Sequence, residues 1–202
     1  MFQARIHGRG GQGVVTAAEL LSLAAFAEGR HAQAFPSFGS ERTGAPVVSF
    51  CRIDEHPIRT REPVAHPDAL IVQDATLLHQ VDVFGGLAPE GYVLINSVHT
   101  LEELGLGEWA MTFRRDRLLS VPAADIARRA TGAPRANAAL LGGLAALTGV
   151  VSLDSVRAAI EQRFPGRLGS GNAAAAAECF AVVARRLGRE PVTAEREEPA
   201  HA

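Results

Sequence analysis

The sequence predicts an α/β fold, a three-layer sandwich with a mostly parallel sheet that carries an antiparallel hairpin. Through the first two thirds of the chain, short apolar segments typical of buried strands alternate with segments of helical spacing, which favours helices on the faces of a sheet. A strand expected over 46–53 is followed by a turn and a short returning strand at Ile58, which would form the hairpin. The last third is helical in pattern, so we expect a helical C-terminal third.

The first two thirds open with "FQARIHG" (2–8), whose alternating apolar residues indicate a strand. Residues 14–27 are rich in Ala and Leu and predict a long helix, which Gly29 is expected to end. The spacing of Leu77, Leu78 and Val81 is typical of a helix. The other expected strands are two buried ones over 68–74 and 91–97 and two short ones over 109–113 and 118–122.

Four helices are expected in the last third, with Ser152 as the N-cap of the third and Asp154 in its first turn. Their ranges are 122–132, 135–150, 153–164 and 172–188. Residues 189–202 are polar and contain proline, so we expect a flexible tail behind a single domain over 1–188.

The composition narrows the class of protein. The 202 residues are 47% hydrophobic and 21% charged, with a net charge of −2, which favours a packed domain and disfavours nucleic-acid binding. We find neither an apolar stretch of membrane-spanning length nor a signal-peptide core, so we expect a cytoplasmic protein without a membrane contact. The two cysteines are too few for an iron–sulfur cluster and are expected to be small buried residues, and no metal-ligand spacing is present.

Gly8, Gly10 and Gly13 have the spacing G-x-G-x-x-G at the start of the first helix, where free N–H groups favour an anion. No acidic residue follows about 20 positions later, which disfavours an independent dinucleotide site, and the Gly-Lys-Ser/Thr ending of a P-loop is absent. The glycines alternatively let the helix pack on the sheet. Gly11 and Gln12 exceed what such packing requires, which favours a binding loop.

A second segment, over 30–45, is long for a connection within a compact domain. It contains two phenylalanines and an arginine, a composition suited to an interface or a ligand rim. The alternative is a surface loop with its phenylalanines in the core. We find no nucleophile–base pair in the sequence, since Ser37 and Ser40 have no evident partner. For Asp74, capping of the next helix is favoured over catalysis.

Together these segments resemble the gamma subunit, or gamma-type domain, of 2-oxoacid:acceptor oxidoreductases. The resemblance is carried by "GRGGQGVVTAAELL" and "QAFPSFGSERTGAPVVSFCRI", two long segments in the family's order and spacing. It continues through "PDALIVQDATLL", "GYVLINS" and "VPAADIARRATG" to "NAALLGGLAALTGVVSLDSVRAAIEQRF", where Asn137 stands at the family's usual Asn. Nearly the whole chain except the tail is covered.

The resemblance implies a non-autonomous subunit of an enzyme. Such complexes oxidatively decarboxylate a 2-oxoacid, transfer the acyl group to coenzyme A and pass two electrons to ferredoxin or NAD. The expected partners are alpha, beta and delta subunits and, in some complexes, an extra flavin/NAD subunit. Thiamine diphosphate with Mg²⁺ and [4Fe–4S] clusters are expected in those subunits, and this chain alone is expected to hold no cofactor. The sequence selects neither the 2-oxoacid nor the acceptor.

We therefore expect a coenzyme A contact and a partner interface, with no catalytic or metal-binding residue in this chain. The residues expected to bind coenzyme A are Gly8, Gly10, Gly11, Gln12, Gly13 and Arg42. Those expected at the interface with the catalytic subunits are Phe35, Ser37, Phe38, Glu41 and Arg42. Two alternatives remain, a free-standing nucleotide- or coenzyme A-binding protein and an assembly scaffold whose glycine loop touches only protein.

Overall fold

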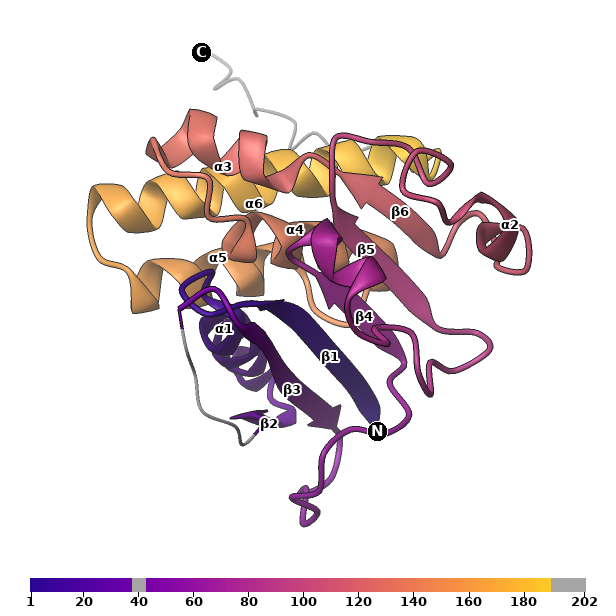
Figure 1. Ribbon diagram of the computed structural model, residues 1–202. Helices are drawn as coiled ribbons and strands as arrows, with labels where there is room; N and C mark the ends of the chain where they lie inside the picture. The colour runs from indigo at the N-terminus through magenta and orange to yellow at the C-terminus, as the bar shows by residue number, and fades with distance from the viewer. Residues whose placement is uncertain (38–42, 190–202) are drawn as a thin grey trace, which may run out of the picture.

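A six-stranded mixed sheet forms the centre of the protein (Figure 1). The computed structural model describes residues 1–37 and 43–189. The strands lie in the order β2-β3-β1-β4-β5-β6. Their bounds are β1 Phe2–Arg9, β2 His31–Pro36, β3 Pro46–Asp54, β4 Ala69–Val72, β5 Tyr92–Asn96 and β6 Leu118–Val121.

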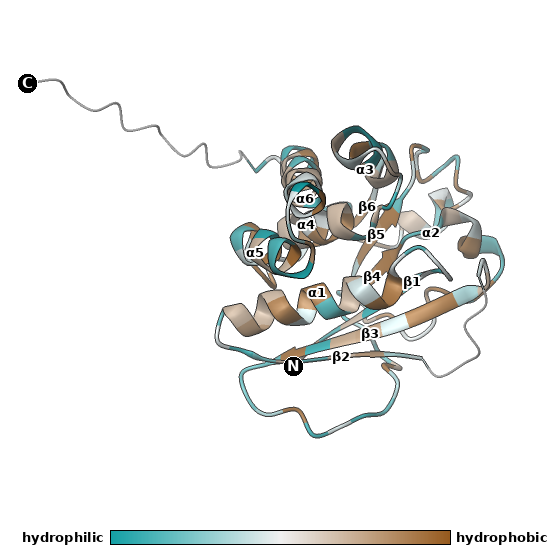
Figure 2. Cartoon of the chain, turned by 90° about the vertical axis from the view of Figure 1, so that its left-hand side faces the viewer, coloured by the Kyte–Doolittle hydropathy of each residue, from teal (hydrophilic) through white to brown (hydrophobic). Residues whose placement is uncertain are grey.

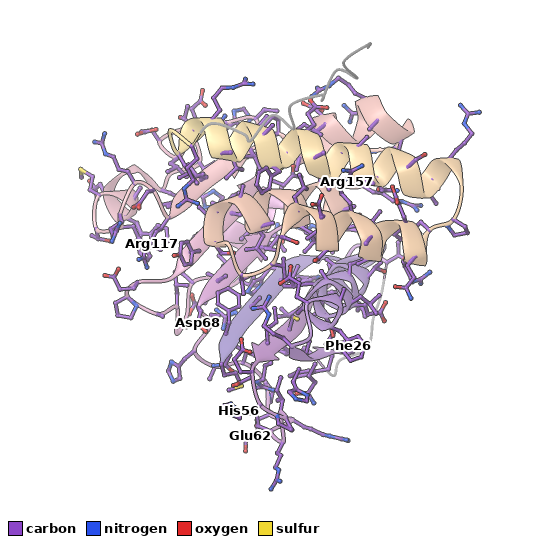
Figure 3. The ribbon with its side chains drawn as sticks, turned by 180° about the vertical axis from the view of Figure 1, so that it is seen from behind. Phe26, His56, Glu62, Asp68, Arg117 and Arg157 are labelled. Carbon is purple, nitrogen blue, oxygen red and sulfur yellow. The ribbon has the colours of Figure 1, made fainter. Side chains whose placement is uncertain are left out.

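Three strand pairings are parallel and two are antiparallel, which confirms the predicted α/β class. β1, β4, β5 and β6 run parallel to one another, whereas β3 pairs antiparallel with both β1 and β2. The hairpin is therefore β2–β3, and the returning strand predicted at Ile58 is wrong. Both edges of β3 are already occupied, so no free edge remains for a strand after it. The connection leaves the sheet instead, and His56 and Glu62 lie on it (Figure 3).

The prediction of a long connection over 30–45 is also wrong in its first half, because His31–Pro36 forms strand β2. Ala32 and Ala34 pack against the main core, and the alternate residues Gln33 and Phe35 face the opposite side of the sheet. Two alanines are a weak strand signal, since β-branched and aromatic residues normally mark strands. The strand forms because each of its residues pairs with a residue of β3, as Phe35 does with Phe50.

Five helices cover one face of the sheet (Figure 2). Their bounds are α1 Val14–Ala27, α3 Ala123–Thr131, α4 Asn137–Thr148, α5 Leu153–Arg163 and α6 Arg167–Arg186. The bounds of α1 are those predicted, and α6 begins five residues before the predicted start at 172. Ser152 caps α5 as predicted, since its side chain accepts a hydrogen bond from the Ser155 N–H at 3.1 Å. With strands β1, β3 and β4, these helices enclose the main core.

Helix α4 lies at the centre of the main core, with eleven of its twelve residues buried, and α6 packs directly on it. Gly142 makes this packing possible. A Cβ at Gly142 would lie 1.9 Å from the carbonyl oxygen of Ala176 in α6, a distance that no side chain tolerates. The approach of the two helices is therefore set by a glycine.

The opposite face carries a smaller second core, formed by the outward residues of β4, β5 and β6. It is covered by the 3₁₀ helix η1 (Ala75–His79), the short helix α2 (Gly107–Ala110) and the loops around them. The strand predicted over 109–113 is wrong, because Trp109 lies between Phe84 and Phe113 in an aromatic cluster, with ring centroids 4.0 and 4.3 Å away. The helix-like spacing of 77–81 yields only the short η1.

Cys51 and Cys179 are free and buried, as predicted. Within the described residues, no helix is long and apolar enough to cross a bilayer. The predicted tail lies outside the described residues except for Arg189.

Replacing Gly142 with alanine should lower the free energy of unfolding by about 1–3 kcal/mol or more, because α4 and α6 must separate to admit the methyl group. Urea unfolding followed by circular dichroism measures the change. Ser170→Ala on the exposed face of α6 is the control and should change stability by no more than about 0.5 kcal/mol. Equal stability of the Gly142 variant and the control would contradict the packing described.

Candidate functional site

The glycine loop lies where the sheet changes the side on which its connections run. β1 leads through Gly10–Gly13 to α1, which packs in the main core. The next parallel strand, β4, leads to η1, whose Leu78 packs against the second core on the opposite face. Such a switch point leaves a crevice at the carboxyl ends of the strands, where α/β proteins bind ligands. The crevice here lies between the ends of β1, β4 and β5.

Two neighbouring cavities occupy this crevice, and Gly11 and Arg135 line both. The larger cavity has a volume of about 540 Å³. Its polar lining comes from Gln12, Gln73, Asp74, Asn96 and Arg135. The smaller cavity measures about 140 Å³ and lies between the starts of α1 and α4. Its polar lining comes from Thr16, Thr131, Arg135, Asn137 and Asn172, and it contains no acidic residue among the described residues that line it.

The glycines of the loop have different roles. A Cβ at Gly8 would lie 2.6 Å from Cγ2 of Val14, so Gly8 lets α1 approach the sheet. Gly13 has a φ of 76°, and a Cβ there would lie 2.5 Å from Nδ2 of Asn137, so Gly13 lets α1 approach α4. The packing alternative therefore accounts for these two positions.

Gly11 is different, because its φ of 92° is a conformation that favours glycine while a Cβ there would meet nothing within 4 Å. It is an exposed point of open backbone between the two cavities. Of the predicted glycines, Gly11 therefore has the geometry of a residue that a ligand can approach closely.

Gly10 joins the two segments that the sequence singles out. Its N–H donates to the carbonyl of Ala45 at 2.9 Å, and its own carbonyl accepts from the N–H of Gly44 at 3.2 Å. Its N–H is therefore occupied within the protein. Gly10 fixes the end of the β2–β3 connection against the glycine loop, which is a positioning role.

Gln12 is also engaged within the protein. Its Oε1 accepts from the N–H of Arg9 at 2.8 Å, and its Nε2 donates to Oδ2 of Asp74 at 2.9 Å. Arg9 forms an ion pair with the same Asp74 oxygen at 3.0 Å and donates further to Thr76 Oγ1 and the Gly44 carbonyl. This network ties the glycine loop to the end of β4 and to the second segment.

Asp74 is the centre of that network and caps η1, as predicted, by accepting from the Thr76 N–H at 3.0 Å. Burial by itself raises the pKa of Asp74. Hydrogen bonds from Thr76 and Gln12 and the charge of Arg9 outweigh burial and hold the pKa below its ordinary value. Asp74 is therefore a stable negative charge on the wall of the larger cavity.

The starts of α1 and α4 both border the smaller cavity, through Thr16 and Asn137. Among the described residues, neither helix has a side-chain cap or an acidic residue in its first turn. The first bond of α1 runs from Ala17 N–H to Gly13 O, so the N–H groups of residues 14–16 precede the helical ladder. Two helix dipoles with their positive ends beside Arg135 favour an anion.

The predicted interface residues lie away from these cavities where they are described. Phe35 packs on Phe50 across the β2–β3 pair, at 5.2 Å between ring centroids, and beneath the guanidinium of Arg52. Ser37 is exposed, and its N–H donates to the Val48 carbonyl at 2.8 Å. The remaining predictions in this segment lie outside the described residues, namely Phe38, Glu41 and Arg42.

Three polar residues that line the larger cavity were not predicted, Gln73, Asn96 and Arg135. Asn96 holds two elements together, since its Nδ2 donates to the Gln73 carbonyl and its Oδ1 accepts from the Ala124 N–H, both at 2.9 Å. The positions of Gln73 and Asn96 in the sequence could have predicted them as site residues. Both stand at the ends of neighbouring parallel strands, whose carboxyl ends meet at one edge of the sheet. Within the described residues, no group of His, Cys, Asp and Glu is placed to hold a metal ion.

The chain belongs to the pyruvate ferredoxin/flavodoxin oxidoreductase family, whose sequence profile it matches over residues 3–182. It is similar to the common subunit gamma of the pyruvate/ketoisovalerate oxidoreductases of Pyrococcus abyssi, with 47% identity over 180 residues, 89% of this chain and 96% of the relative. Pyruvate synthase subunit PorC of Methanocaldococcus jannaschii is 45% identical over 188 residues, 93% of this chain and 100% of the relative.

A solved structure extends this likeness to three dimensions. The crystal structure of pyruvate oxidoreductase subunit PORC from Thermotoga maritima superposes with a TM-score of 0.73 at 34% identity, covering 89% of this chain and 94% of that one. The resemblance seen in the two glycine-containing segments is thereby confirmed at the level of the family.

Replacing Asp74 with asparagine should lower the free energy of unfolding at neutral pH by about 1–3 kcal/mol, because Arg9 and Gln12 lose a charged acceptor. Because the pKa of Asp74 is lower in the folded state, its carboxylate stabilises the fold at pH values above the unfolded-state pKa. This stabilisation is lost as the pH falls through the folded-state pKa. The difference between wild type and variant should therefore shrink in acid. Urea unfolding from neutral to acidic pH measures it.

Glu161→Gln, at an exposed position of α5, is the control for the loss of one carboxylate. It should change stability by no more than about 0.5 kcal/mol. A difference between wild type and the Asp74 variant that stays constant into acid would contradict the role given to the Asp74 charge.

Proposed function

We propose that this chain is the gamma-type subunit of a thiamine-dependent 2-oxoacid:acceptor oxidoreductase, in which it contacts the catalytic subunits and helps to bind coenzyme A. The complex oxidatively decarboxylates a 2-oxoacid to the acyl-CoA and passes the electrons to ferredoxin or NAD. Membership of the family supports the reaction of the complex. The crevice beside Gly11 supports the part given to this chain.

The observation that carries the coenzyme A contact is the meeting of two uncapped helix starts at the smaller cavity. The diphosphate of coenzyme A is an anion that the N–H groups of residues 14–16 can bind. Gly11 allows the ligand to approach the backbone, and Arg135 adds a positive charge. Because Asp74 lies in the wall of the larger cavity only, its charge favours a phosphate in the smaller one.

The residues of this chain do not fit the other cofactors of such a complex. The two cysteines are buried, and burial raises the pKa of each thiol to about 12, which disfavours thiolate ligands for an iron–sulfur cluster. We assign the clusters and the thiamine diphosphate with its Mg²⁺ to alpha, beta and delta subunits. We also assign the contact with those subunits to the segment that contains Phe35, Ser37, Phe38, Glu41 and Arg42.

In this mechanism the chain binds and orients coenzyme A, which supplies the thiol that accepts the acyl group. The helix starts and Arg135 hold the phosphates at one end of the crevice. The Arg9–Asp74–Gln12 network ties the glycine loop to Gly44, at the end of the connection that follows β2. We also propose that this protein is cytoplasmic.

An assembly scaffold is the second candidate, and specific contacts favour it. Gly8, Gly10 and Gly13 have roles inside the protein, so a glycine-rich loop alone does not require a ligand. The two functions differ at Gly11, whose open backbone no internal contact explains.

Replacing Gly11 with valine tests the proposal in the complex purified through a tag on this chain. A β-branched residue strains the backbone at a φ of 92° and narrows the crevice, so the KM for coenzyme A should rise roughly tenfold or more, the usual range for one lost close contact. The KM for the 2-oxoacid should stay near its wild-type value. Kinetics with each substrate varied separately measure both.

Gly149→Val is the matched control, because Gly149 has a φ of 66°, open surroundings and a place at the far end of α4. Any change in kinetics or in the yield of complex that backbone strain alone causes should appear in this variant too. A lower yield of complex with an unchanged KM for coenzyme A in the Gly11 variant would support the scaffold. Unchanged kinetics and an unchanged complex mass would reject both roles for Gly11.

A further inference from the structure

Gln73 is a buried polar residue in the wall of the larger cavity, with 4% of its surface exposed. It directly follows β4, on the face of the sheet that Ile71 gives to the main core. Its Cβ lies 3.2 Å from the place that a Cβ on Gly8 would take, so it stands at the base of the glycine loop.

The side-chain amide of Gln73 has no partner. Both Nε2 and Oε1 are buried without a hydrogen bond to any described residue. Among the described residues it is alone in having a buried, unpaired donor and acceptor together, since His7, Gln33 and Arg52 each have one such atom. Buried amides are nearly always paired, so this exception requires an explanation.

The neighbouring amides in the same cavity wall do not share this property. Asn96 uses its donor to hold the Gln73 carbonyl and its acceptor to hold the start of α3. Gln12 uses both ends on Arg9 and Asp74. Gln73 is thus the amide of this wall whose donor and acceptor both lack a partner among the described residues.

The chemistry of the missing partner follows from the two unpaired atoms. A phosphate oxygen accepts only, so it satisfies Nε2 and leaves Oε1 unpaired. A secondary amide, or the amino–imine edge of an adenine, presents a donor beside an acceptor and satisfies both. The same wall carries one acidic and one basic side chain, Asp74 and Arg135, so these two residues give it no net positive charge to attract an anion. The volume of about 540 Å³ is within the range of small-molecule sites.

We propose that Gln73 is a specificity residue that binds an uncharged donor–acceptor edge of coenzyme A in the larger cavity, while the phosphates bind in the smaller one. The inference rests on the proposed function. Coenzyme A has two sources of this chemistry, the amides of its pantetheine arm and the adenine edge. Either one pairs with Gln73 through two hydrogen bonds.

Gln73→Met keeps the size of the side chain and removes both hydrogen-bonding atoms. Calorimetric titration of the assembled complex with coenzyme A should show a dissociation constant roughly 10- to 100-fold higher, as expected for two lost hydrogen bonds. The thermal midpoint of the full-length chain should not fall, because an unpaired buried amide has been replaced by an apolar group. Gln73→Asn, which withdraws the amide by one methylene, should weaken binding in the same way and serves if the Met variant does not fold.

Gln33→Met is the matched control, since Gln33 has one unpaired buried atom but lies on β2, outside both cavities. It should leave the dissociation constant unchanged. Titration with pantetheine and with adenosine 3′,5′-bisphosphate then shows which half of coenzyme A loses affinity in the Gln73 variant.

Equal affinity of wild type and the Gln73 variants for coenzyme A would overturn this inference while leaving the proposed function intact. A lower thermal midpoint with unchanged affinity would overturn it too, and would indicate that an internal water satisfies Gln73. Absence of coenzyme A binding by the wild-type complex would overturn the proposed coenzyme A contact itself, and the inference with it.

Discussion

The close approach of α1 to β1 and α4 is the constraint on which the rest of the site depends. Gly8 and Gly13 occupy the two contact points. A Cβ at Gly8 would lie 2.6 Å from Val14, and a Cβ at Gly13 would lie 2.5 Å from Asn137, far inside van der Waals contact. This approach places the start of α1 beside the start of α4 and leaves both without side-chain caps among the described residues. The anion-favouring field of the crevice is therefore a consequence of helix packing, and Gly11 is the point at which it opens to solvent.

Electrostatics then divide the crevice into two parts. Asp74 stays ionised because its hydrogen bonds and Arg9 outweigh burial, and its charge lies in the wall of the larger cavity. Arg135 lines both cavities, and the smaller one adds two helix dipoles, with no acidic residue in the part of its lining that the structure describes. A ligand with both charged and uncharged parts, such as coenzyme A, matches this division. The same Arg9 network reaches Gly44 and Thr76, so it ties the glycine loop to the end of β4 and to the residues just before β3.

The sequence predicted correctly those features of the fold that a local pattern of residues determines. The α/β class, the bounds of α1, the Ser152 cap and the role of Asp74 as a cap were all confirmed. β2 was missed because its two core residues are alanines and its stability comes from pairing with β3, a contact that lies outside the segment itself. At the candidate site, the sequence singled out the glycine loop, whereas Gln73, Asn96 and Arg135 come from separate segments that only the fold brings together. The internal roles of Gly10 and Gln12 likewise depend on distant partners, Ala45 and Asp74.

In the proposed function, the residues of this chain bind and position coenzyme A while other subunits carry out the redox chemistry. Anaerobic purification from the native host through a small tag on this chain, followed by identification of the co-eluting proteins and measurement of iron and thiamine diphosphate, tests that claim most directly. We expect a complex that contains a thiamine-binding subunit and a cysteine-rich cluster protein and that oxidises a 2-oxoacid in the presence of coenzyme A. Recovery of this chain alone, as a monomer or homodimer without iron or thiamine diphosphate, would contradict it.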